Sequence, residues 1–407
     1  MNDIASLSKM ETKIGEIGEA DIVVGILCKN VETTILHVLN AVNEGLHRYF
    51  PDYENVIVVS DGFSSDRTVE LANLFQVNNG IKKVVTEDMV KKGKGAGIKT
   101  IFQAANIMNA KMVILLDGDL LSIKPEWIYE FAAPVLYGRT DLVVPYYIRD
   151  KYDGVITNNL VYPFTRALYG IDIRQPIAGE YSLSKRLYKM LMEHPLFPLD
   201  FGIDIFIVTS AAANRMKIME GLFSIKIHES TTRYMEPEDL LIPMFKQVTG
   251  SMFEMAKYYE NFWRGNGINS SRTHLPPFHG KRPLPVKINL EKMMDYFYRD
   301  FSRSKAIIEY LLPKELMKKL SIIENNIEKF DGEIWSEVVY NFAAHYKNLK
   351  DEREKKNVLN ALESLWLGRF VSYAMKTRGM DITEAEEIIE EQARIFEEKK
   401  KYLLSIY

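Results

Sequence analysis

Asp117 and Asp119 lie one residue apart at the end of the apolar run Ile114–Leu116. Two carboxylates this close repel each other unless a cation lies between them. Carboxylate oxygens are the ligands that Mg²⁺ and Mn²⁺ prefer in proteins. A turn with two solvated aspartates is the alternative, because an Asp-x-Asp pattern alone is common. The position favours a metal site, since α/β sheets bind ligands where their strands end.

Lys94 and Asp61 are the next candidates for binding chemistry. Lys94 is flanked by two glycines just before a helical pattern, so the N–H groups at the helix start are expected to receive phosphate. A flexible basic loop is the alternative. In the segment SDGFSSDRT, Ser65 or Asp66 can cap the next helix, which leaves Asp61 at the strand end without a structural explanation.

Three more polar side chains stand out because their neighbours are apolar. Glu180 follows the apolar stretch of QPIAGE, with no obvious cationic partner nearby in the sequence. Asp204 interrupts the run DFGIDIFI, where an unpaired carboxylate is costly, which favours a functional or hydrogen-bonded role. His228 ends the alternating pattern of SIKIHES. A lone histidine is usually structural, so His228 by itself does not indicate a ligand.

Short apolar runs alternate with amphipathic stretches in the first two-thirds of the chain. The runs predict strands over residues 22–28, 56–60, 83–86, 112–117 and 142–147. The stretches between them predict helices over residues 31–48, 66–75, 96–108 and 125–135. Strands that alternate with helices predict a mostly parallel sheet with helices on both faces. The polar segments that follow three of these strands are then expected to gather at one edge.

The last third of the chain has a different pattern. Residues 264–288 are rich in Gly, Ser and Pro and show no periodicity. Beyond them, residues 290–312, 332–348, 357–379 and 382–404 show a helical period. We therefore expect a catalytic domain over 1–265, a linker or active-site loop over 266–288, and an all-helical domain over 289–407. The apolar faces of these helices either pack on the catalytic domain or form a homodimer.

Composition excludes several classes of protein. Lys and Arg number 52 and Asp and Glu 55, so the net charge of −3 gives no reason to expect nucleic-acid binding. The single cysteine, Cys28, excludes an internal disulfide and a multi-cysteine zinc site. No segment resembles a signal peptide or reaches the roughly 18 apolar residues that cross a bilayer, which favours a cytoplasmic protein.

Taken in order, the segments GKG, DGDLLSIKPEWI, QPIAGE, GID and a downstream histidine resemble the GT-A nucleotide-sugar glycosyltransferases. Among these, the similarity is greatest to the retaining enzymes that make mannosylglycerate, glucosylglycerate or glucosyl-3-phosphoglycerate. It extends into the helical region, at LWLGRFVSYAMKTRGMD. The resemblance implies a GT-A fold, in which a Rossmann-like, mostly parallel sheet is flanked by helices. It also implies a GDP- or UDP-hexose donor and Mg²⁺ or Mn²⁺ as cofactor.

The resemblance also assigns roles on the donor side of the site. Asp117 and Asp119 belong to the family's Asp-x-Asp motif, Asp119 being the more direct metal contact, and His228 completes the metal site. Lys94 matches a lysine near the donor. The remaining donor-side positions are Lys29, Asn30, Glu32 and Asp61 at the base and ribose, and Ala178, Gly179 and Glu180 in the loop that lines the sugar pocket.

On the acceptor side, the resemblance concerns the residues after the predicted strand 142–147. In the family an Arg, an Asp four residues on and a Thr four residues after that hold the acceptor, and Arg149, Asp153 and Thr157 have this spacing. Asp204 matches the carboxylate beside the anomeric carbon. This sequence departs from the family at Gly118, where alanine is common, and in LCKN, which lacks the usual proline and leaves the base undecided.

The expected function is therefore metal-dependent, retaining transfer of glucose or mannose from a nucleoside-diphosphate sugar to D-glycerate or 3-phosphoglycerate. The product would be a compatible solute or its precursor. Because no carboxylate pair is evident for a double displacement, we expect front-face attack, with the hydroxyl oriented by Asp153 and Thr157. Two alternatives stay open. A sugar-phosphate nucleotidyltransferase would typically carry a glycine-rich, arginine-containing loop where this chain has LCKNVETT, and a noncatalytic nucleotide-sugar-binding protein would share the pocket.

Overall fold

The computed structural model describes residues 14–229, 241–265 and 282–407. These residues form two compact units. The first, called the sheet unit, comprises Met1–Ile148 and Ile177–Ser230. The second, called the helical unit, comprises Arg149–Pro176 and Thr231–Tyr407.

One seven-stranded sheet forms the centre of the sheet unit, with the order β3-β2-β1-β4-β6-β5-β7. Its strands are β1 (Ile22–Cys28), β2 (Asn55–Asp61), β3 (Ile81–Glu87), β4 (Met112–Asp117), β5 (Leu142–Ile148), β6 (Tyr181–Ser184) and β7 (Ile218–Ile225). Strand β6 pairs antiparallel with β4 and β5, whereas the other pairs within the described sheet are parallel. Strands β1, β2 and β4 are buried along almost their whole length, as continuous apolar runs in a parallel sheet should be.

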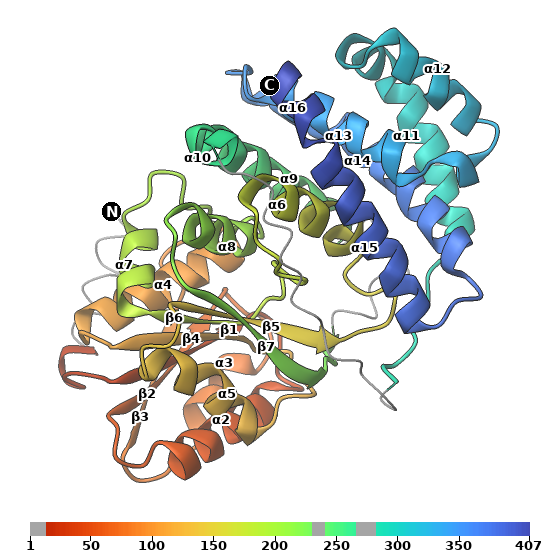
Figure 1. The fold of residues 1–407 in the computed structure, drawn as a ribbon. Coiled ribbons are helices and arrows are strands. Elements are labelled where there is room, and N and C mark those ends of the chain that lie inside the picture. The colour runs from red at the N-terminus through yellow and green to blue at the C-terminus, as the bar shows by residue number, and fades with distance from the viewer. Residues whose placement is uncertain (1–13, 230–240, 266–281) are drawn as a thin grey trace. The chain divides into compact units, whose positions relative to one another are not determined.

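Helices cover both faces of this sheet. They are α2 (Ile35–Tyr49), α3 (Thr68–Leu74), α4 (Lys94–Ile107), α5 (Pro125–Leu136), α7 (Lys185–Met192) and α8 (Ile203–Ala213). Helices α2, α3 and α5 pack on one face, and α4, α7 and α8 on the other (Figure 1). This arrangement confirms the predicted mostly parallel α/β sheet.

The helical unit confirms that the C-terminal region is helical. It also contains residues that were predicted to belong to the catalytic domain. Its elements are the π-helix η1 (Thr157–Val161), the 3₁₀ helix η3 (Ile327–Lys329), and α6 (Tyr162–Tyr169), α9 (Leu241–Tyr258), α10 (Glu260–Gly265), α11 (Leu290–Leu311), α12 (Lys314–Ile323), α13 (Gly332–Tyr346), α14 (Glu352–Thr377), α15 (Ile382–Glu398) and α16 (Lys400–Ile406). The indoles of Trp263, Trp335 and Trp366 are fully buried in its core.

The observed division of the chain differs from the predicted domains 1–265, 266–288 and 289–407. Residues 149–176 and helices α9 and α10 group with the C-terminal helices rather than with the sheet. The physical reason is packing, because α6 contacts α15 and α9 contacts α14. Most of the predicted linker, residues 266–281, lies outside the described residues.

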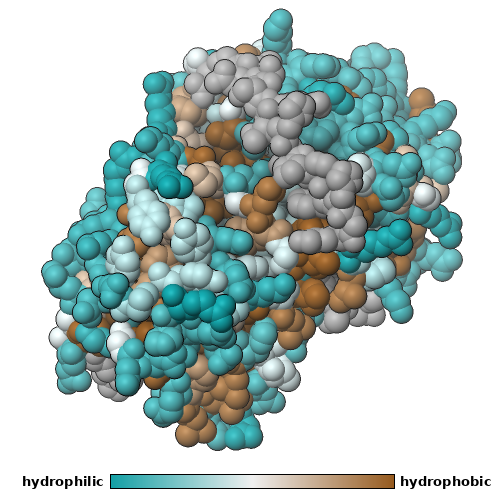
Figure 2. Space-filling model, turned by 60° about the horizontal axis from the view of Figure 1, so that its bottom comes forward, coloured by the Kyte–Doolittle hydropathy of each residue, from teal (hydrophilic) through white to brown (hydrophobic). Residues whose placement is uncertain are grey.

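Hydrophilic side chains cover much of the face shown in Figure 2, with apolar residues in patches between them. None of the helices described is both long enough and apolar enough to cross a membrane.

Candidate active site

The candidate donor-side residues gather where neighbouring strands of the sheet unit end. Strand β1 lies between β2 and β4, with Cys28 opposite Asp61 and Leu27 opposite Asp117. The carboxylates of Asp61 and Asp117 therefore extend from the same edge of the sheet. This is the edge where parallel sheets bind ligands.

The ammonium of Lys94 joins three segments at this edge. Its Nζ lies 3.0 Å from Asp117 Oδ1, 2.9 Å from the carbonyl oxygen of Gly179 and 3.5 Å from Asp204 Oδ2. Asp204 lies in the first turn of α8 and is 8% exposed. The structure thus brings four of the predicted site residues together from β4, α4, α8 and the loop before β6.

Burial and charge shift the pKa values in this cluster in opposite directions. Burial by itself would lower the pKa of Lys94, but the charges of Asp117, Asp204 and Glu180 outweigh it and raise that pKa. Burial raises the pKa of Asp204, opposed by Lys94. Asp204 Oδ1 is buried and has no hydrogen-bond partner among the described residues. A buried carboxylate oxygen of this kind is available to accept a hydrogen bond from a ligand.

The glycine-lysine segment differs from its expected role in one respect. The backbone N–H of Gly95 donates to Asp200 O at 3.2 Å, and that of Ala96 donates to Leu199 O at 3.2 Å. These two N–H groups, predicted to receive phosphate, are therefore occupied by a neighbouring loop. That loop lies so close that a Cβ on Gly95 would be 2.1 Å from Pro198 O. The side chain of Lys94 is what this segment contributes to the site.

Asp119 and His228 lie together, as the predicted metal site requires. Asp119 Oδ2 is 3.8 Å from His228 Nδ1, and Leu120 forms an isolated bridge with His228 that links the two segments. In the described part of the chain, no group of three or more His, Cys, Asp or Glu side chains is placed to hold a metal ion. A carboxylate and an imidazole still fit Mg²⁺ or Mn²⁺, because such ions often complete their coordination with substrate phosphates and water.

Gly118, between the two aspartates, fits a position with no space for a side chain. Its N–H donates to Leu27 O at 2.8 Å, and its carbonyl oxygen accepts from the Thr34 hydroxyl at 2.7 Å. A Cβ would lie 2.8 Å from Leu27 O and 2.9 Å from Cys28 Sγ. Glycine therefore allows the Asp-x-Asp turn to pack against β1.

Gly118→Ala is expected to destabilise the protein by about 1–3 kcal/mol, the usual cost of inserting a methyl group into a packed site. Urea unfolding of the variant measures this change. Gly379→Ala is the matched control, since a Cβ on Gly379 meets nothing within 4 Å. Equal stability of the two variants would contradict the close packing of the turn.

Glu180 has a cationic partner that the sequence did not reveal. Lys226 Nζ lies 2.8 Å from both carboxylate oxygens of Glu180 and 2.8 Å from Ala178 O. Tyr147 donates its hydroxyl to Glu180 Oε2 at 2.9 Å, and Glu180 is fully buried. The pair fixes the loop of Ala178 and Gly179 beside Lys94. The only sequence signal was a lysine between two isoleucines at the end of an alternating pattern.

The residues expected at the nucleotide mostly make local contacts. Asp61 accepts from the hydroxyl and the N–H of Ser64, at 2.6 and 2.9 Å. Glu32 Oε2 accepts from the N–H of Arg67 at 2.8 Å, which ties the loop after β1 to the loop after β2. Lys29 is exposed. Their part in nucleotide binding stays a prediction.

Asp88 is a buried acid at this edge that sequence reasoning missed, because it lies in the polar stretch TEDMVKKGKG. It follows β3, is 6% exposed and accepts from the Ser60 hydroxyl at 2.6 Å. Burial raises its pKa to about 6; the charge of Asp61 adds to this rise, and Ser60 and Lys29 oppose it.

Asp88 should make the protein less stable as the pH rises from about 4 to about 6. In that range the folded protein keeps a proton that the unfolded chain has lost, so the free energy of unfolding falls by about 2–3 kcal/mol and then levels off. Asp88→Asn keeps an oxygen for Ser60 and should remove this fall. Urea unfolding across the range measures it, with the exposed Glu87→Gln as control. An unchanged pH profile in Asp88→Asn would refute the assignment.

The candidate acceptor residues belong to the helical unit, directly after β5. Arg149 Nε is 3.9 Å from Asp153 Oδ2, and their side chains are 12% and 4% exposed. Gly154, with a φ of 70°, lies beside both Arg149 and Thr157. A Cβ on it would be 3.3 Å from Arg149 Nη1 and 3.7 Å from Thr157 Oγ1. The structure thus brings the three predicted residues together around one glycine.

Residues 23–216 match the family model of glycosyl transferase family 2. No curated protein matches the chain. Among solved structures, glucosyl-3-phosphoglycerate synthase from Mycobacterium tuberculosis with Mn²⁺, UDP and glucosyl-3-phosphoglycerate is 24% identical, over 60% of this chain and 83% of that one, with a TM-score of 0.47. The same enzyme with Mn²⁺, UDP-glucose and phosphoglyceric acid is 23% identical, over 68% and 92%, with a TM-score of 0.48.

The family match covers β1 to β6 and therefore the segments that carry Lys94, Asp117 and Asp204. Together with the mostly parallel sheet, it confirms the GT-A type of fold expected from the sequence. In residues 23–216 the protein resembles the glycosyltransferases of family 2.

Proposed function

We propose that the protein is a metal-dependent, retaining glycosyltransferase that moves a hexose from a nucleoside-diphosphate sugar to D-glycerate or 3-phosphoglycerate. The hexose is glucose or mannose. The observation that carries this proposal is the partly buried cluster of Lys94, Asp117 and Asp204 at the ligand-binding edge, inside the segment that matches the family.

Asp204 would lie beside the anomeric carbon of the transferred sugar, where the acceptor attacks. Its Oδ2 is held by Lys94, and its Oδ1, which finds no partner in the described residues, would accept a hydrogen bond from a sugar hydroxyl. The backbone of Ala178 and Gly179, fixed by the pair of Lys226 and Glu180, would line the sugar pocket. These polar groups are held in place before the sugar binds. Water molecules in their place would not have this fixed orientation.

Asp119 and His228 would hold Mg²⁺ or Mn²⁺ beside Asp117. When bound, such an ion offsets the negative charge that grows on the leaving diphosphate. The ammonium of Lys94 lies against Asp117 and adds a second positive charge at this position. The protein residues thus supply both the ligands for the ion and a fixed cation of their own.

On the acceptor side, Arg149 would bind the carboxylate of the acceptor. Its guanidinium can donate two parallel hydrogen bonds, which suits a carboxylate better than a lysine does. Asp153 and Thr157 would orient the attacking hydroxyl. We infer attack on the face that the diphosphate leaves, and the hydroxyl proton then passes to the leaving phosphate oxygen.

A panel of nucleotide-sugars crossed with the two acceptors tests the proposal. UDP- and GDP-linked glucose and mannose would each be incubated with D-glycerate or 3-phosphoglycerate and Mn²⁺, and the products identified by mass spectrometry. The proposal requires two products, the acceptor carrying the transferred hexose and free nucleoside diphosphate. Formation of nucleoside triphosphate and sugar 1-phosphate when pyrophosphate is added to the nucleotide-sugar would indicate a nucleotidyltransferase instead. Binding of the nucleotide-sugar without turnover would indicate a noncatalytic protein.

A further inference from the structure

The acceptor turn, defined as residues 149–161, is held by the C-terminal helices of its own unit. It ends in the π-helix η1, a rare element that often marks functional sites. Its Asp153, Thr157 and Asn158 are buried, and η1 continues directly into α6. Buried polar side chains need hydrogen-bond partners.

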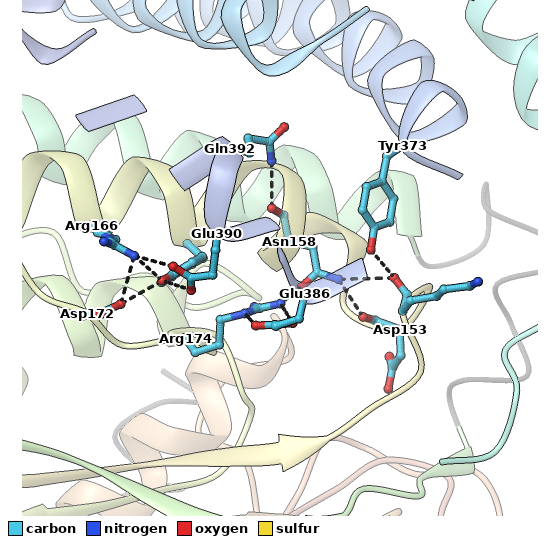
Figure 3. A network of polar contacts seen from close by, with 11 residues as sticks. Asp153, Asn158, Arg166, Asp172, Arg174, Tyr373, Glu386, Glu390 and Gln392 are labelled. Carbon is cyan, nitrogen blue, oxygen red and sulfur yellow. Dashed lines mark hydrogen bonds and ion pairs between the residues drawn. The ribbon is translucent and has the colours of Figure 1, made fainter. Parts of the chain in front are cut away.

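Helix α14 supplies the first set of partners. Lys151 Nζ lies 2.6 Å from the carbonyl oxygens of Thr377 and Met380, at the end of α14 where a cation is favoured. Tyr373 donates its hydroxyl to Lys151 O at 3.1 Å (Figure 3). The side chain of Lys151 therefore fastens the turn to α14.

Helix α15 supplies the second set, which converges on Asn158 (Figure 3). Gln392 Nε2 donates to Asn158 O at 3.0 Å, and Arg174 Nη2 donates to Asn158 Oδ1 at 2.9 Å. Asn158 Nδ2 in turn donates to Asp153 O at 3.3 Å. Glu386 forms a two-point contact with Arg174, with Oε2 at 3.0 Å from Nη2 and Oε1 on Nε.

This chain of contacts is charged and largely buried, which determines its effect on the turn. The side chain of Arg174 is 4% exposed and that of Glu386 25% exposed. A buried ion pair adds little stability compared with well-packed apolar residues, but the loss of one partner leaves a costly charge. Its clearest physical effect is to fix the geometry of the groups that it contacts. Here three successive contacts lead from Glu386 through Arg174 and Asn158 to the backbone of Asp153.

We infer that Glu386 and Arg174 are positioning residues for acceptor binding, because through Asn158 they fix the turn that carries Arg149, Asp153 and Thr157. This inference rests on the proposed function, which makes those three residues the acceptor site. Neither Glu386 nor Arg174 needs to touch a substrate in this role. The C-terminal helices are thus the template on which the acceptor site is built.

Glu386→Gln tests the inference, because it removes the charge and keeps the shape. The acceptor KM should rise about tenfold, the effect of one weakened charged hydrogen bond, while the donor KM stays within about twofold. Glu387→Gln, an exposed neighbour on α15, is the matched control and should change neither. Tyr373→Phe, a milder change, should raise the acceptor KM about threefold.

Amide hydrogen exchange keeps the test independent of the acceptor's identity. Amides of residues 152–158 should exchange faster in Glu386→Gln than in the wild type or in Glu387→Gln. If the wild-type protein transfers to neither acceptor, the proposed function fails, and the exchange data alone decide the positioning role. Unchanged exchange, or equal rises in the donor and acceptor KM, would overturn the inference.

Discussion

Asp119→Ala should reduce hexosyl transfer by at least about 10³-fold while leaving the fold intact. The carboxylate of Asp119 and the imidazole of His228 are the proposed metal ligands, with 3.8 Å between Oδ2 and Nδ1. Loss of a ligand removes several kcal/mol of charge compensation at the leaving diphosphate, and about 1.4 kcal/mol corresponds to a tenfold change in rate. Initial rates of nucleoside-diphosphate release at saturating Mn²⁺ measure the effect.

Asp52→Ala is the matched control for this variant, because Asp52 is an exposed aspartate before the start of β2, away from the carboxyl ends of the strands. It should keep the wild-type rate. Removal of divalent ions by EDTA should reproduce the loss in the wild type, and added Mn²⁺ should reverse it. Full activity of Asp119→Ala, or of the wild type in EDTA, would refute the metal site.

Arg149→Ala should raise the acceptor KM by about 10- to 100-fold and leave the donor KM nearly unchanged. A hydrogen bond to a charged group contributes about 1.5–3 kcal/mol, which corresponds to this range. The guanidinium lies 3.9 Å from Asp153 and is 12% exposed, so its loss acts mainly on the turn that it occupies. Steady-state kinetics with each substrate varied in turn separate the two constants.

Two comparisons sharpen this prediction. Arg149→Lys keeps the charge but loses the two-pronged contact, so its acceptor KM should fall between those of the wild type and Arg149→Ala. Arg303→Ala, at a position where 72% of the side chain is exposed, should leave both constants unchanged. An equal effect of Arg149→Ala on the donor and acceptor KM would refute the acceptor role.

The sheet could be predicted from the sequence where its strands are buried on both faces. Strands β1 and β4 have the predicted bounds, because parallel, buried strands appear as uninterrupted apolar runs. The short strand β6 was not predicted. Four residues, YSLS, carry too little periodicity to distinguish a strand from a cap, and the strand depends on its antiparallel pairing with β4 and β5.

The candidate site was only partly accessible from the sequence. The Asp-x-Asp pair, Lys94 and Asp204 are unusual residues in apolar or glycine-rich surroundings. Asp117 and Asp204 do lie at the ammonium of Lys94, and Asp119 lies beside His228. The partner of Glu180 lies 46 residues further along the chain, and no local pattern indicates such a pairing. The same holds for Glu386, 212 residues from its partner Arg174. Long-range contacts of this kind are set by packing, which a single sequence does not show.

The anomeric configuration of the transfer product tests the central claim most directly. The wild-type protein would be incubated with Mn²⁺, an α-linked nucleoside-diphosphate hexose and D-glycerate or 3-phosphoglycerate, and the product examined by NMR. The account predicts an α-glycosidic bond in the product and one nucleoside diphosphate released for each bond formed. A β-linked product, or no transfer from any donor of the panel to either acceptor, would contradict it.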